Sequence, residues 1–322
     1  MHLIIQIPCF NEENTLPLVV RDLPKKINGI SKIEYLIIDD GSRDHTVAVA
    51  KKLGIRHIVS LPYNQGLANA FRGGLEACLE LGADIVVNTD GDNQYNGGNI
   101  PDLVKPILDG KAGMVIGERP IMNIEHFSFL KKILQKFGSY VVRKISNTSV
   151  IDAPSGFRAF SRDAIMQLNL VNDYTYTLES IIQAGHKRIP VANVPITTNG
   201  KTRESRLMKS IPSYIKNSLI AIIRTWISYA SFRIFLKLSL FFITGASFLG
   251  IRYLYFMYFD LNPAGHVQSL ILMTVLFFIG FQMIVLGLIG DMISSNRKRV
   301  ELMTYELRKM KYSQNKSFKK KS

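Results

Sequence analysis

Short apolar runs alternate with segments of helical periodicity along the first 210 residues of the chain. The runs have the length and composition of buried strands and occupy residues 3–7, 35–38, 57–60, 85–88 and 114–116. Apolar residues recur at helical spacing in residues 16–27, 46–53, 66–81 and 100–108. This alternation predicts an α/β domain with helices on both faces of a mostly parallel sheet. Ligands bind such sheets at the carboxyl ends of the strands, so candidate chemistry is expected directly after each run.

Two longer apolar stretches follow near the end of the chain. Residues 238–259 contain one charged residue, Arg252, and residues 267–290 contain none. Each reaches the roughly 20 residues that an α-helix needs to cross a bilayer. We therefore predict two transmembrane helices and disfavour the alternative of two core helices in a soluble protein. Arg252 is expected to snorkel to the outer headgroups, with a contact to another subunit or to a lipid phosphate as the alternative.

The charges around these stretches predict their orientation. Arg233 and Lys237 precede the first stretch, residues 297–299 supply three more basic side chains after the second, and residues 260–266 contain no Lys or Arg. Cytoplasmic flanks are enriched in Lys and Arg, so both outer flanks are expected in the cytoplasm. Residues 1–7 are too short for the apolar core of a signal peptide. We therefore expect an integral protein of the cell inner membrane with its large domain and both termini cytoplasmic.

Residues 211–236 separate the large domain from the first stretch. They are apolar but include Lys216, Arg224, Trp226 and Tyr229. We interpret them as helices lying at the membrane surface, with an ordinary domain helix as the alternative. The predicted organisation is a cytoplasmic domain (1–210), interfacial helices (211–236), a transmembrane hairpin (237–291) and a basic cytoplasmic tail (292–322).

The net charge supports a membrane partner. The chain has 40 Lys and Arg against 25 Asp and Glu, a net charge of +15, and ten basic and two acidic residues from Arg297 onward place +8 of it in the tail. A basic tail beside a membrane helix suits anionic lipid better than nucleic acid, and no aromatic–basic stacking platform is evident. The two cysteines exclude a disulfide framework and a cysteine-based zinc site.

Acidic motifs follow three of the predicted strands. They are IPCFNEE (7–13), DDGSRD (39–44) and DGDNQ (90–94). Crowded carboxylates repel one another and need a cation or hydrogen-bond donors. Asp90 and Asp92, two residues apart, can both face one hard cation, and Gln94 can add an amide oxygen. Such oxygen ligands favour Mg²⁺ or Mn²⁺ and leave coordination positions for a diphosphate.

This ordered trio resembles the family 2 glycosyltransferases of the GT-A (Rossmann-like) fold. Within that family the chain looks like the dolichol-phosphate mannose synthases and the bacterial polyprenyl-phosphate glycosyltransferases. Further motifs fit this branch: NQGLANA (64–70), GER (117–119), DAPSGFR (152–158) and the two C-terminal spans. The resemblance covers residues 1–290 and implies that residues 1–210 form the glycosyltransferase domain.

The resemblance implies a role for each strand-end motif. The nucleotide-sugar donor would be bound by Pro8, Asn11, Glu12, Asp39, Asp40, Asp90 and Arg119, although Asn, Asp and Ser are also ordinary turn and cap residues. Mg²⁺ or Mn²⁺ would be held by Asp90, Asp92 and Gln94. Arg119 would pair with phosphate, for which its planar guanidinium is suited, with a surface arginine as the alternative. Lys131 or Lys132 could add a phosphate contact, and Gly156 and Phe157 would shape the floor of the site.

The acceptor side is implied by the loop GKTRESR (200–206), in which Glu204 departs from the glycine usual in this family. A polyprenyl phosphate acceptor would be bound there by Lys201, Arg203, Ser205 and Arg206. The implied reaction is a single displacement that inverts the anomeric centre, with Asp92, Arg119 and Arg203 as the catalytic residues. Glu179 is a second candidate carboxylate, with a helix-surface position as the alternative.

Three other functions compete with this hypothesis. A processive polysaccharide synthase is disfavoured because Trp226 follows Thr225, which breaks the Gln-x-x-Arg-Trp signature. A family 2 transferase acting on a saccharide hydroxyl in glycan assembly remains the main alternative. A non-enzymatic membrane adaptor would not be expected to keep all three acidic motifs. Small residues in the spans, such as Gly245 and Gly280, could support a homo-oligomer.

Overall fold

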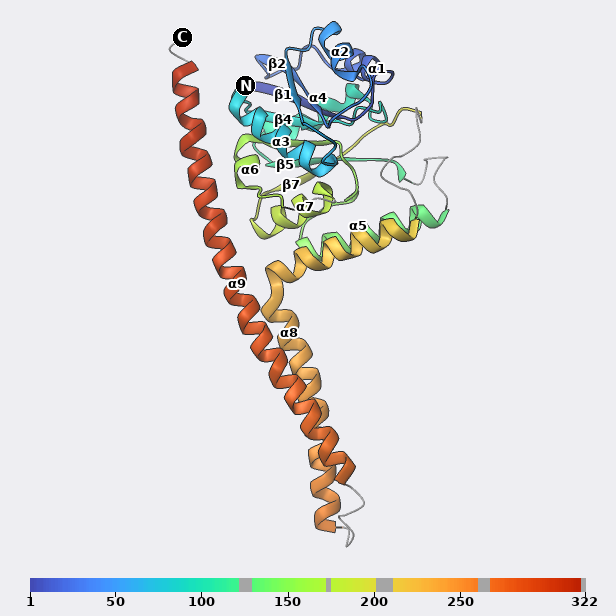
Figure 1. Cartoon of the computed structure of the whole chain (residues 1–322), viewed down its shortest axis with the longest axis vertical. Helices are drawn as coiled ribbons and strands as arrows, with labels where there is room; N and C mark the ends of the chain where they lie inside the picture. Colours follow the sequence, from blue (N-terminus) through green and yellow to red (C-terminus); the bar gives the residue numbers. More distant parts are fainter. Residues whose placement is uncertain (122–128, 172–174, 201–210, 260–266, 320–322) are drawn as a thin grey trace. The chain divides into compact units, whose positions relative to one another are not determined.

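The computed structural model describes residues 1–121, 129–171, 175–200, 211–259 and 267–319 (Figure 1). The chain divides into two compact units. Unit 1 contains Met1–Ile223 together with Leu302–Ser322, and unit 2 contains Arg224–Glu301.

Unit 1 is built on one seven-stranded sheet of order β3-β2-β1-β4-β6-β5-β7. Its strands are β1 (His2–Cys9), β2 (Lys32–Asp39), β3 (His57–Ser60), β4 (Ile85–Asn88), β5 (Met114–Glu118), β6 (Arg158–Ser161) and β7 (Val191–Pro195). Only β6 runs against its neighbours, β4 and β5; the other strand pairs are parallel. The mostly parallel α/β sheet and all five predicted strands are confirmed.

The strand register determines where the candidate chemistry lies. Cys9 at the end of β1 pairs with Asp39 at the end of β2, and Gln6 of β1 pairs with Asn88 at the end of β4. The carboxyl ends of β1, β2, β4 and β5 therefore share one edge of the sheet. Because β6 is reversed, the segment that enters it, residues 152–157, reaches this same edge.

Helices connect the strands of unit 1 (Figure 1). They are α1 (Leu16–Asp22), α2 (Thr46–Lys52), α3 (Leu67–Leu81), the 3-10 turn η1 (Gly97–Asn99), α4 (Ile100–Leu108), α5 (Phe129–Ser146), α6 (Arg162–Gln167) and α7 (Tyr176–His186). The four predicted helices are confirmed, but α1 is shorter than residues 16–27. It ends at Asp22 because Leu23 precedes Pro24 and adopts an extended ψ of 139°.

Alternation along β1 divides the core between the two faces of the sheet. Leu3, Ile5 and Ile7 are buried in one apolar cluster with residues of α1 and α4. On the other face α3 packs against β1 and β2. There Gly74 of α3 lies against Gln6 and Ile38, so the helix comes close to the sheet. Burial on both faces explains why these strands appear in the sequence as nearly continuous apolar runs.

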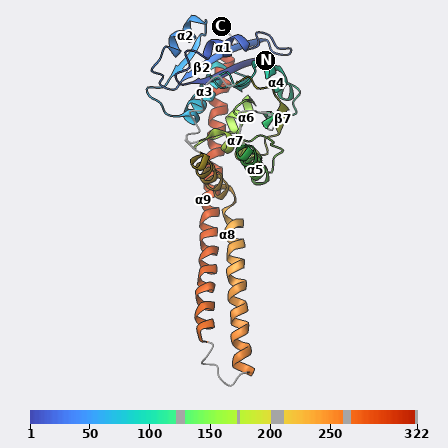
Figure 2. The ribbon, with the colours of Figure 1, turned by 90° about the vertical axis from the view of Figure 1, so that its right-hand side faces the viewer.

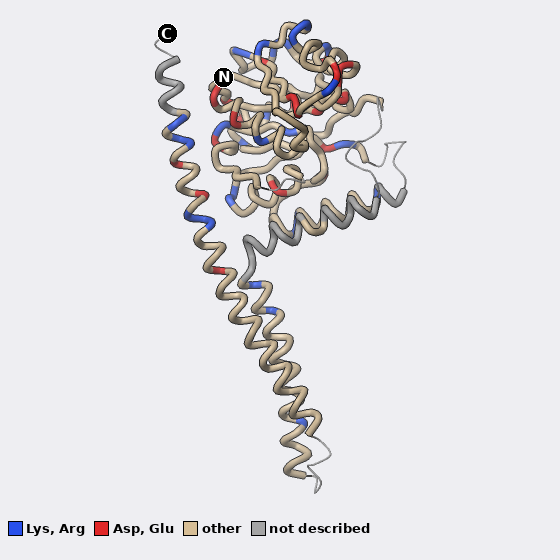
Figure 3. The backbone as a smooth tube through the Cα atoms, viewed as in Figure 1, with Lys and Arg blue, Asp and Glu red and all other residues tan. Residues whose placement is uncertain are grey.

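Unit 2 contains most of two long helices, α8 (Ile211–Phe259) and α9 (Val267–Lys319). Within it the two helices lie side by side, with Gly280 of α9 against Ser239 and Ile243 of α8 (Figure 2). Phe232–Phe259 and Val267–Tyr312 each contain a stretch long and apolar enough to cross a membrane, and the most apolar 18-residue windows of the two have mean hydropathies of 1.9 and 2.5. Residues 238–259 contain one charged residue, Arg252, and residues 267–290 contain none, so these stretches are almost entirely tan in Figure 3.

The side chains of unit 2 are mostly outward-facing. Only 11% of the most apolar window of each helix is buried within the structure, whereas a core helix of a soluble protein is mostly buried. Phe241, Phe248 and Tyr258 are at least 70% exposed. Such an apolar surface suits a lipid environment. The helices therefore support membrane anchoring, and the four-part division and the orientation of the spans stay predictions.

Candidate active site

Backbone–side-chain hydrogen bonds join the loop after β1 to the loop after β2. The Asn11 N–H donates to Ser42 Oγ (2.9 Å), and the Arg43 N–H donates back to Asn11 Oδ1 (2.8 Å). The Glu12 N–H donates to Thr46 Oγ1 (2.8 Å). Asn11 has a left-handed φ of 54°, which asparagine tolerates better than most residues. The two predicted donor-binding motifs therefore form one connected surface at the sheet edge.

The two aspartates after β2 are buried and bind backbone amides. Asp39 Oδ1 accepts from the Ser42 N–H (3.0 Å), and the Asp40 carboxylate accepts from the Gln65 N–H (2.7 Å) and the Gly66 N–H (2.9 Å). Burial raises the pKa of Asp40, and these two amides partly offset that rise. Asp40 therefore stabilises the turn that precedes α3. This is the turn-and-cap role that was the alternative to a contact with the nucleotide-sugar donor.

Asp44 shows the opposite balance. Burial alone would raise its pKa, but hydrogen bonds from the Thr46 hydroxyl, the Thr46 N–H and the Glu13 N–H lower the pKa below its ordinary value. Asp44 thereby supports the start of α2, which begins at Thr46. Its carboxylate is charged at neutral pH and structural in role.

The DGDNQ loop after β4 is held in a tight turn. The Gln94 N–H donates to Asp92 Oδ1 (3.1 Å), and Asn93 has a left-handed φ of 58°. Asn199, which follows β7, donates through its backbone N–H to the Gln94 carbonyl (2.9 Å) and through Nδ2 to the Asn93 carbonyl (3.1 Å). Asn199 lies just before the predicted acceptor loop, so the chain returns to the β4 loop at that point.

Two glycines let neighbouring loops approach the β4 loop closely. A Cβ on Gly91 would lie 3.2 Å from both Glu12 Cγ and the Pro8 carbonyl oxygen. A Cβ on Gly156 would lie 3.3 Å from both carboxylate oxygens of Asp90 and 2.8 Å from the Tyr176 hydroxyl. The loops after β1 and before β6 therefore both lie against the DGDNQ loop, as expected for one continuous site.

Arg119 follows β5 at the same edge and is nearly buried. Its Nε and NH2 donate to the two carboxylate oxygens of Asp152 at 2.7 and 2.9 Å, and the Arg119 N–H also reaches Asp152 (3.3 Å). The Arg119 side chain is 7% exposed and that of Asp152 is not exposed. The surface-arginine alternative is wrong, because a bidentate buried pair holds this guanidinium in one orientation.

Arg158 is the residue to which sequence reasoning assigned no role. It is fully buried at the start of β6 and donates to the carbonyls of Ser155 (2.7 Å), Ala153 (2.7 Å) and Thr177 (2.8 Å) and to Ser180 Oγ (2.6 Å). Burial lowers its pKa to about 10, well above neutral pH, so the side chain stays charged. Arg158 thus fixes the loop that carries Asp152 and Gly156.

Aromatic side chains complete the floor of this loop. The Gly156 N–H donates to Tyr95 Oη (2.9 Å), and Asn88 Nδ2 donates to the Gly156 carbonyl (2.9 Å) and to Tyr176 Oη (3.1 Å). Tyr95 stacks on Phe157 with ring centroids 5.1 Å apart. Burial raises the pKa of Tyr95 to about 12 and holds that of Tyr176 well above its ordinary value, so both phenols stay protonated at neutral pH.

Asp90, Asp92 and Gln94 fit a hard divalent cation by the chemistry of their donors, which are two carboxylates and an amide oxygen. Within the described ranges, no group of three or more His, Cys, Asp or Glu side chains forms a metal-binding cluster. These three oxygen donors are fewer than the six that an octahedral Mg²⁺ ion takes, so coordination positions would remain for phosphate oxygens. Gly156 places no side chain against the carboxylate of Asp90.

The remaining predicted residues are distributed as follows. Lys201, Arg203, Ser205 and Arg206 lie outside the described residues, as does the side chain of Lys131. Lys132 lies on α5. Glu179 is buried on α7 rather than at a helix surface, and its carboxylate accepts from the Val171 N–H at 3.1 and 3.2 Å. Its contacts tie a neighbouring loop to α7.

The fold and its acidic sheet edge define a GT-A-like α/β domain. The family model for glycosyl transferase family 2 matches residues 4–168, and the chain belongs to that family. The sequence resemblance is thereby confirmed.

Relatives and solved structures extend this assignment. The chain is 29% identical over 214 residues to the UDP-N-acetylglucosamine–dolichyl-phosphate N-acetylglucosaminyltransferase of Methanococcus voltae, across 60% of this chain and 83% of that one. It is 24% identical over 230 residues to the polyprenol monophosphomannose synthase of Mycolicibacterium smegmatis, across 68% and 84%. The fold matches glucosyl-3-phosphoglycerate synthase from Mycobacterium tuberculosis, solved with Mn²⁺, UDP-glucose and phosphoglyceric acid, with TM-score 0.55, 21% identity and coverage of 70% and 79%.

Proposed function

We propose that this family 2 glycosyltransferase moves a hexose from a UDP- or GDP-sugar to a polyprenyl phosphate, undecaprenyl or dolichyl, at the cytoplasmic face of the membrane. The observation that carries the proposal is the single sheet edge at which the acidic motifs after β1, β2 and β4 meet, in a chain that also has two helices of spanning length. Two relatives named for dolichyl- or polyprenol-linked sugar transfer support the lipid acceptor.

The donor nucleotide is proposed to bind across the loops after β1 and β2. Pro8, Asn11 and Glu12 present one side of this surface, and Asp39 and Asp40 present the other. Asp90, Asp92 and Gln94 would hold Mg²⁺ or Mn²⁺ next to the diphosphate. The fold neighbour was solved with Mn²⁺ and UDP-glucose together, which supports a divalent ion beside a nucleotide-sugar. Such an ion, when bound, supplies Lewis-acid stabilisation of the departing diphosphate.

Arg119 is proposed to stabilise the same leaving group. Its bidentate bond to Asp152 orients the guanidinium before substrate arrives, so little reorganisation accompanies the reaction. The acceptor phosphate is proposed to bind Lys201, Arg203, Ser205 and Arg206. A phosphate monoester has its second pKa near 6, so it is already an anion at neutral pH and needs no general base. A single in-line displacement would then invert the anomeric centre.

The alternative acceptor is a saccharide hydroxyl, which would need a carboxylate base at the site. Asp40 and Glu179 both accept hydrogen bonds from backbone amides. These two carboxylates therefore hold backbone segments in place, whereas a phosphate acceptor is already an anion and needs no base.

A transfer assay on membranes carrying the chain tests the proposal. The mixture contains undecaprenyl phosphate, Mn²⁺ or Mg²⁺, and a panel of radiolabelled UDP- and GDP-sugars. We expect one donor to label the organic phase, the label to require metal, and Asp92→Ala to abolish it. Asp102→Ala, which removes an exposed carboxylate from α4, is the matched control. A wild-type chain that binds nucleotide but labels no lipid would refute the phosphate acceptor and favour a saccharide hydroxyl.

A further inference from the structure

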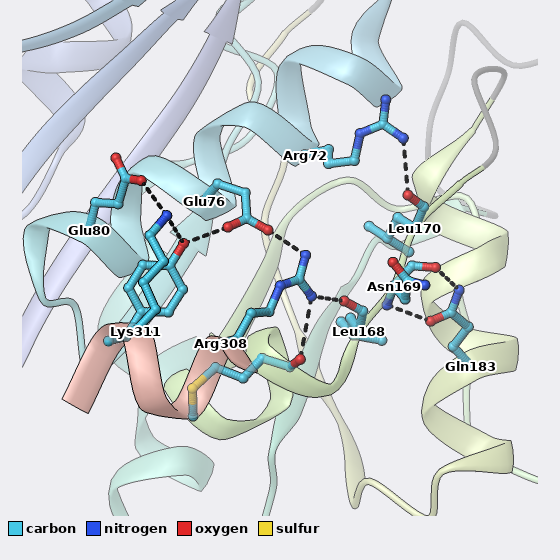
Figure 4. Close-up of polar contacts among 11 residues, drawn as sticks. Arg72, Glu76, Glu80, Leu168, Asn169, Leu170, Gln183, Arg308 and Lys311 are labelled. Carbon is cyan, nitrogen blue, oxygen red and sulfur yellow. Dashed lines mark hydrogen bonds and ion pairs between the residues drawn. The ribbon is translucent and has the colours of Figure 1, made fainter. Parts of the chain in front are cut away.

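The last turns of α9 carry more than a basic tail. Leu302–Ser322 belongs to unit 1, and its described side chains contact α3 and α6 (Figure 4). Arg308 pairs with Glu76 of α3, and Tyr312 Oη donates to the same carboxylate at 2.6 Å. Lys311 Nζ lies 3.0 Å from Glu80, one turn further along α3. The two glutamates of α3 therefore form ion pairs and a hydrogen bond with basic and phenolic side chains of α9.

The last turns of α9 also form hydrogen bonds with α6. Tyr305 Oη donates to Asp163 Oδ1 (2.7 Å), and Arg162 NH2 donates to the Tyr312 carbonyl (3.0 Å). Tyr312 is only 1% exposed, whereas Lys311 and Glu80 are both more than half exposed. Exposed ion pairs contribute little to stability, so the buried Tyr312 and the contacts of Arg308 dominate this surface.

Arg308 also reaches the chain between α6 and α7. Its NH1 donates to the Leu168 carbonyl (2.7 Å) and to the Met166 carbonyl (3.4 Å). The guanidinium therefore joins the carboxylate of α3 to the backbone of residues 166–171. This segment comprises the last two residues of α6 and the four that follow it, and is hereafter called the α6–α7 loop. An arginine suits both kinds of contact, because its guanidinium presents five donors in one fixed plane and can reach partners on two sides.

The α6–α7 loop is held at almost every residue. Arg72 of α3 donates to the Leu170 carbonyl (3.1 Å), and Gln183 of α7 exchanges two hydrogen bonds with the backbone of Asn169 (2.6 and 2.9 Å) (Figure 4). The Val171 N–H donates to Glu179 of α7. Donors and acceptors from α3, α7 and α9 thus converge on one short segment.

Helix α7 leads from this loop to the sheet edge. It carries Tyr176, whose hydroxyl accepts from Asn88 and lies beside Gly156, next to Asp90. Thr177 and Ser180 of the same helix accept from Arg158. A shift of α7 would therefore disturb the floor of the candidate active site.

We propose that the α3–α6 face is the docking surface for the chain's own C-terminal segment Leu302–Tyr312, and that Arg308 is a positioning residue which, through the α6–α7 loop, holds α7 in place. The docking surface stands on the hydrogen bonds and ion pairs alone. Only its effect on sugar transfer rests on the proposed function. The expected partner of this basic segment is thus an acidic protein surface rather than anionic lipid.

Charge reversal tests the docking. Arg308→Glu and Glu76→Arg are compared with Lys309→Glu, which makes the same charge change at an exposed neighbour that lies over the Tyr305 ring. The readout is hydrogen–deuterium exchange of the full chain in detergent, followed in peptides covering residues 302–312 and 166–171. We expect either reversal to raise exchange at least about tenfold in both peptides and the control to leave it unchanged.

The double variant Glu76→Arg/Arg308→Glu sharpens the test. It restores the opposite charges, so we expect protection of residues 302–312 to return. A carboxylate at position 308 has no N–H to donate to the Met166 and Leu168 carbonyls, so the α6–α7 loop should still exchange faster than in the wild-type chain. Unchanged exchange in residues 302–312 for both single reversals would overturn the docking. Protection that appears only in nanodiscs of phosphatidylglycerol would assign the segment to lipid, and protection that rises with protein concentration would assign it to a second copy.

Transfer kinetics test the positioning role. We expect Arg308→Glu to lower kcat several-fold with little change in KM for the nucleotide-sugar, and the double variant to stay impaired because its loop remains loose. Altered exchange with unchanged kcat would overturn the positioning role and leave the docking intact. A wild-type chain that transfers no sugar to lipid would refute the proposed function, while the exchange results would still decide the docking.

Discussion

The two halves of the sheet in unit 1 handle charge differently. In the half formed by β3, β2, β1 and β4, the strands are parallel and largely apolar, and the acidic motifs lie at the strand ends and in the loops after them. In the half formed by β6, β5 and β7, Arg158 begins a strand and is fully buried, and the Arg119–Asp152 pair lies directly beside it. In the proposed function the first half presents carboxylates to the donor, whereas the second half holds the buried cations Arg119 and Arg158 beneath the same edge.

This difference explains why the charged residues of the first half are easier to recognise from the sequence than those of the second. Acidic residues at strand ends stand out against apolar runs. A buried arginine satisfied by backbone carbonyls leaves no such signal, because its partners are peptide groups that every residue has. Substitutions in each half should therefore have different consequences for activity and for stability.

Asp90→Asn should separate the two roles of carboxylates at the sheet edge. Removing this charge beside Gly156 is expected to lower kcat by on the order of 10³-fold, a typical cost of losing a group that stabilises developing charge. Asp44→Asn, whose carboxylate accepts from the Thr46 and Glu13 amides, should instead lower thermal stability. Transfer assays and thermal unfolding of both variants check this. Equal losses of activity at equal stability would contradict the division.

Arg158→Met should destabilise the second half of the sheet. It removes the Arg158 donors from the carbonyls of Ala153, Ser155 and Thr177, and each buried acceptor left unpaired costs about 1–3 kcal/mol. Arg158→Lys keeps the charge but has a single head, so it should recover only part of this loss. Chemical unfolding of the three proteins measures the effect. A methionine variant as stable as the wild type would show that the cation is dispensable.

Gly156→Ala should disturb the contact between the loop before β6 and Asp90, which follows β4. Its Cβ would lie 2.8 Å from the Tyr176 hydroxyl, so the loop or the ring must move, at a cost of about 1–3 kcal/mol. Because the same methyl would lie 3.3 Å from Asp90, activity should fall more than stability does. The control Gly54→Ala removes a glycine with open space around it, although its φ of 78° adds backbone strain. Activity measured at matched folded fraction distinguishes the two effects.

Glu34→Gln should have the smallest effect and act at the opposite edge from the site. Burial would raise the pKa of Glu34, but hydrogen bonds from Lys32 and His57 lower it to about 2. Because the folded pKa lies below the unfolded one, the stabilisation is full above about pH 4.5 and is lost as pH falls toward 2. The difference in unfolding free energy between wild type and variant, less than about 1 kcal/mol, should therefore shrink over that range. A constant difference would contradict the assignment.

The site was predictable to unequal degrees. The loops with Asn11, Asp39 and Asp90 were found because they follow apolar strands whose parallel pairing brings their ends together. Asp152, Tyr176 and Arg158 were not assigned roles, because their contacts depend on the reversed strand β6. That strand has only four residues and begins with arginine, so no periodic signal marks it.

Local properties of the chain, its apolar periodicity and its turn chemistry, were enough to locate the strand runs of β1–β5, the acidic motifs after them and the two helices of spanning length. Folding in three dimensions added the insertion of β6 between β4 and β5, the burial of Arg158 and the pairing of Glu76 with Arg308, which lie 232 residues apart. These features depend on long-range packing, which brings a charged side chain next to partners that lie far away in the sequence.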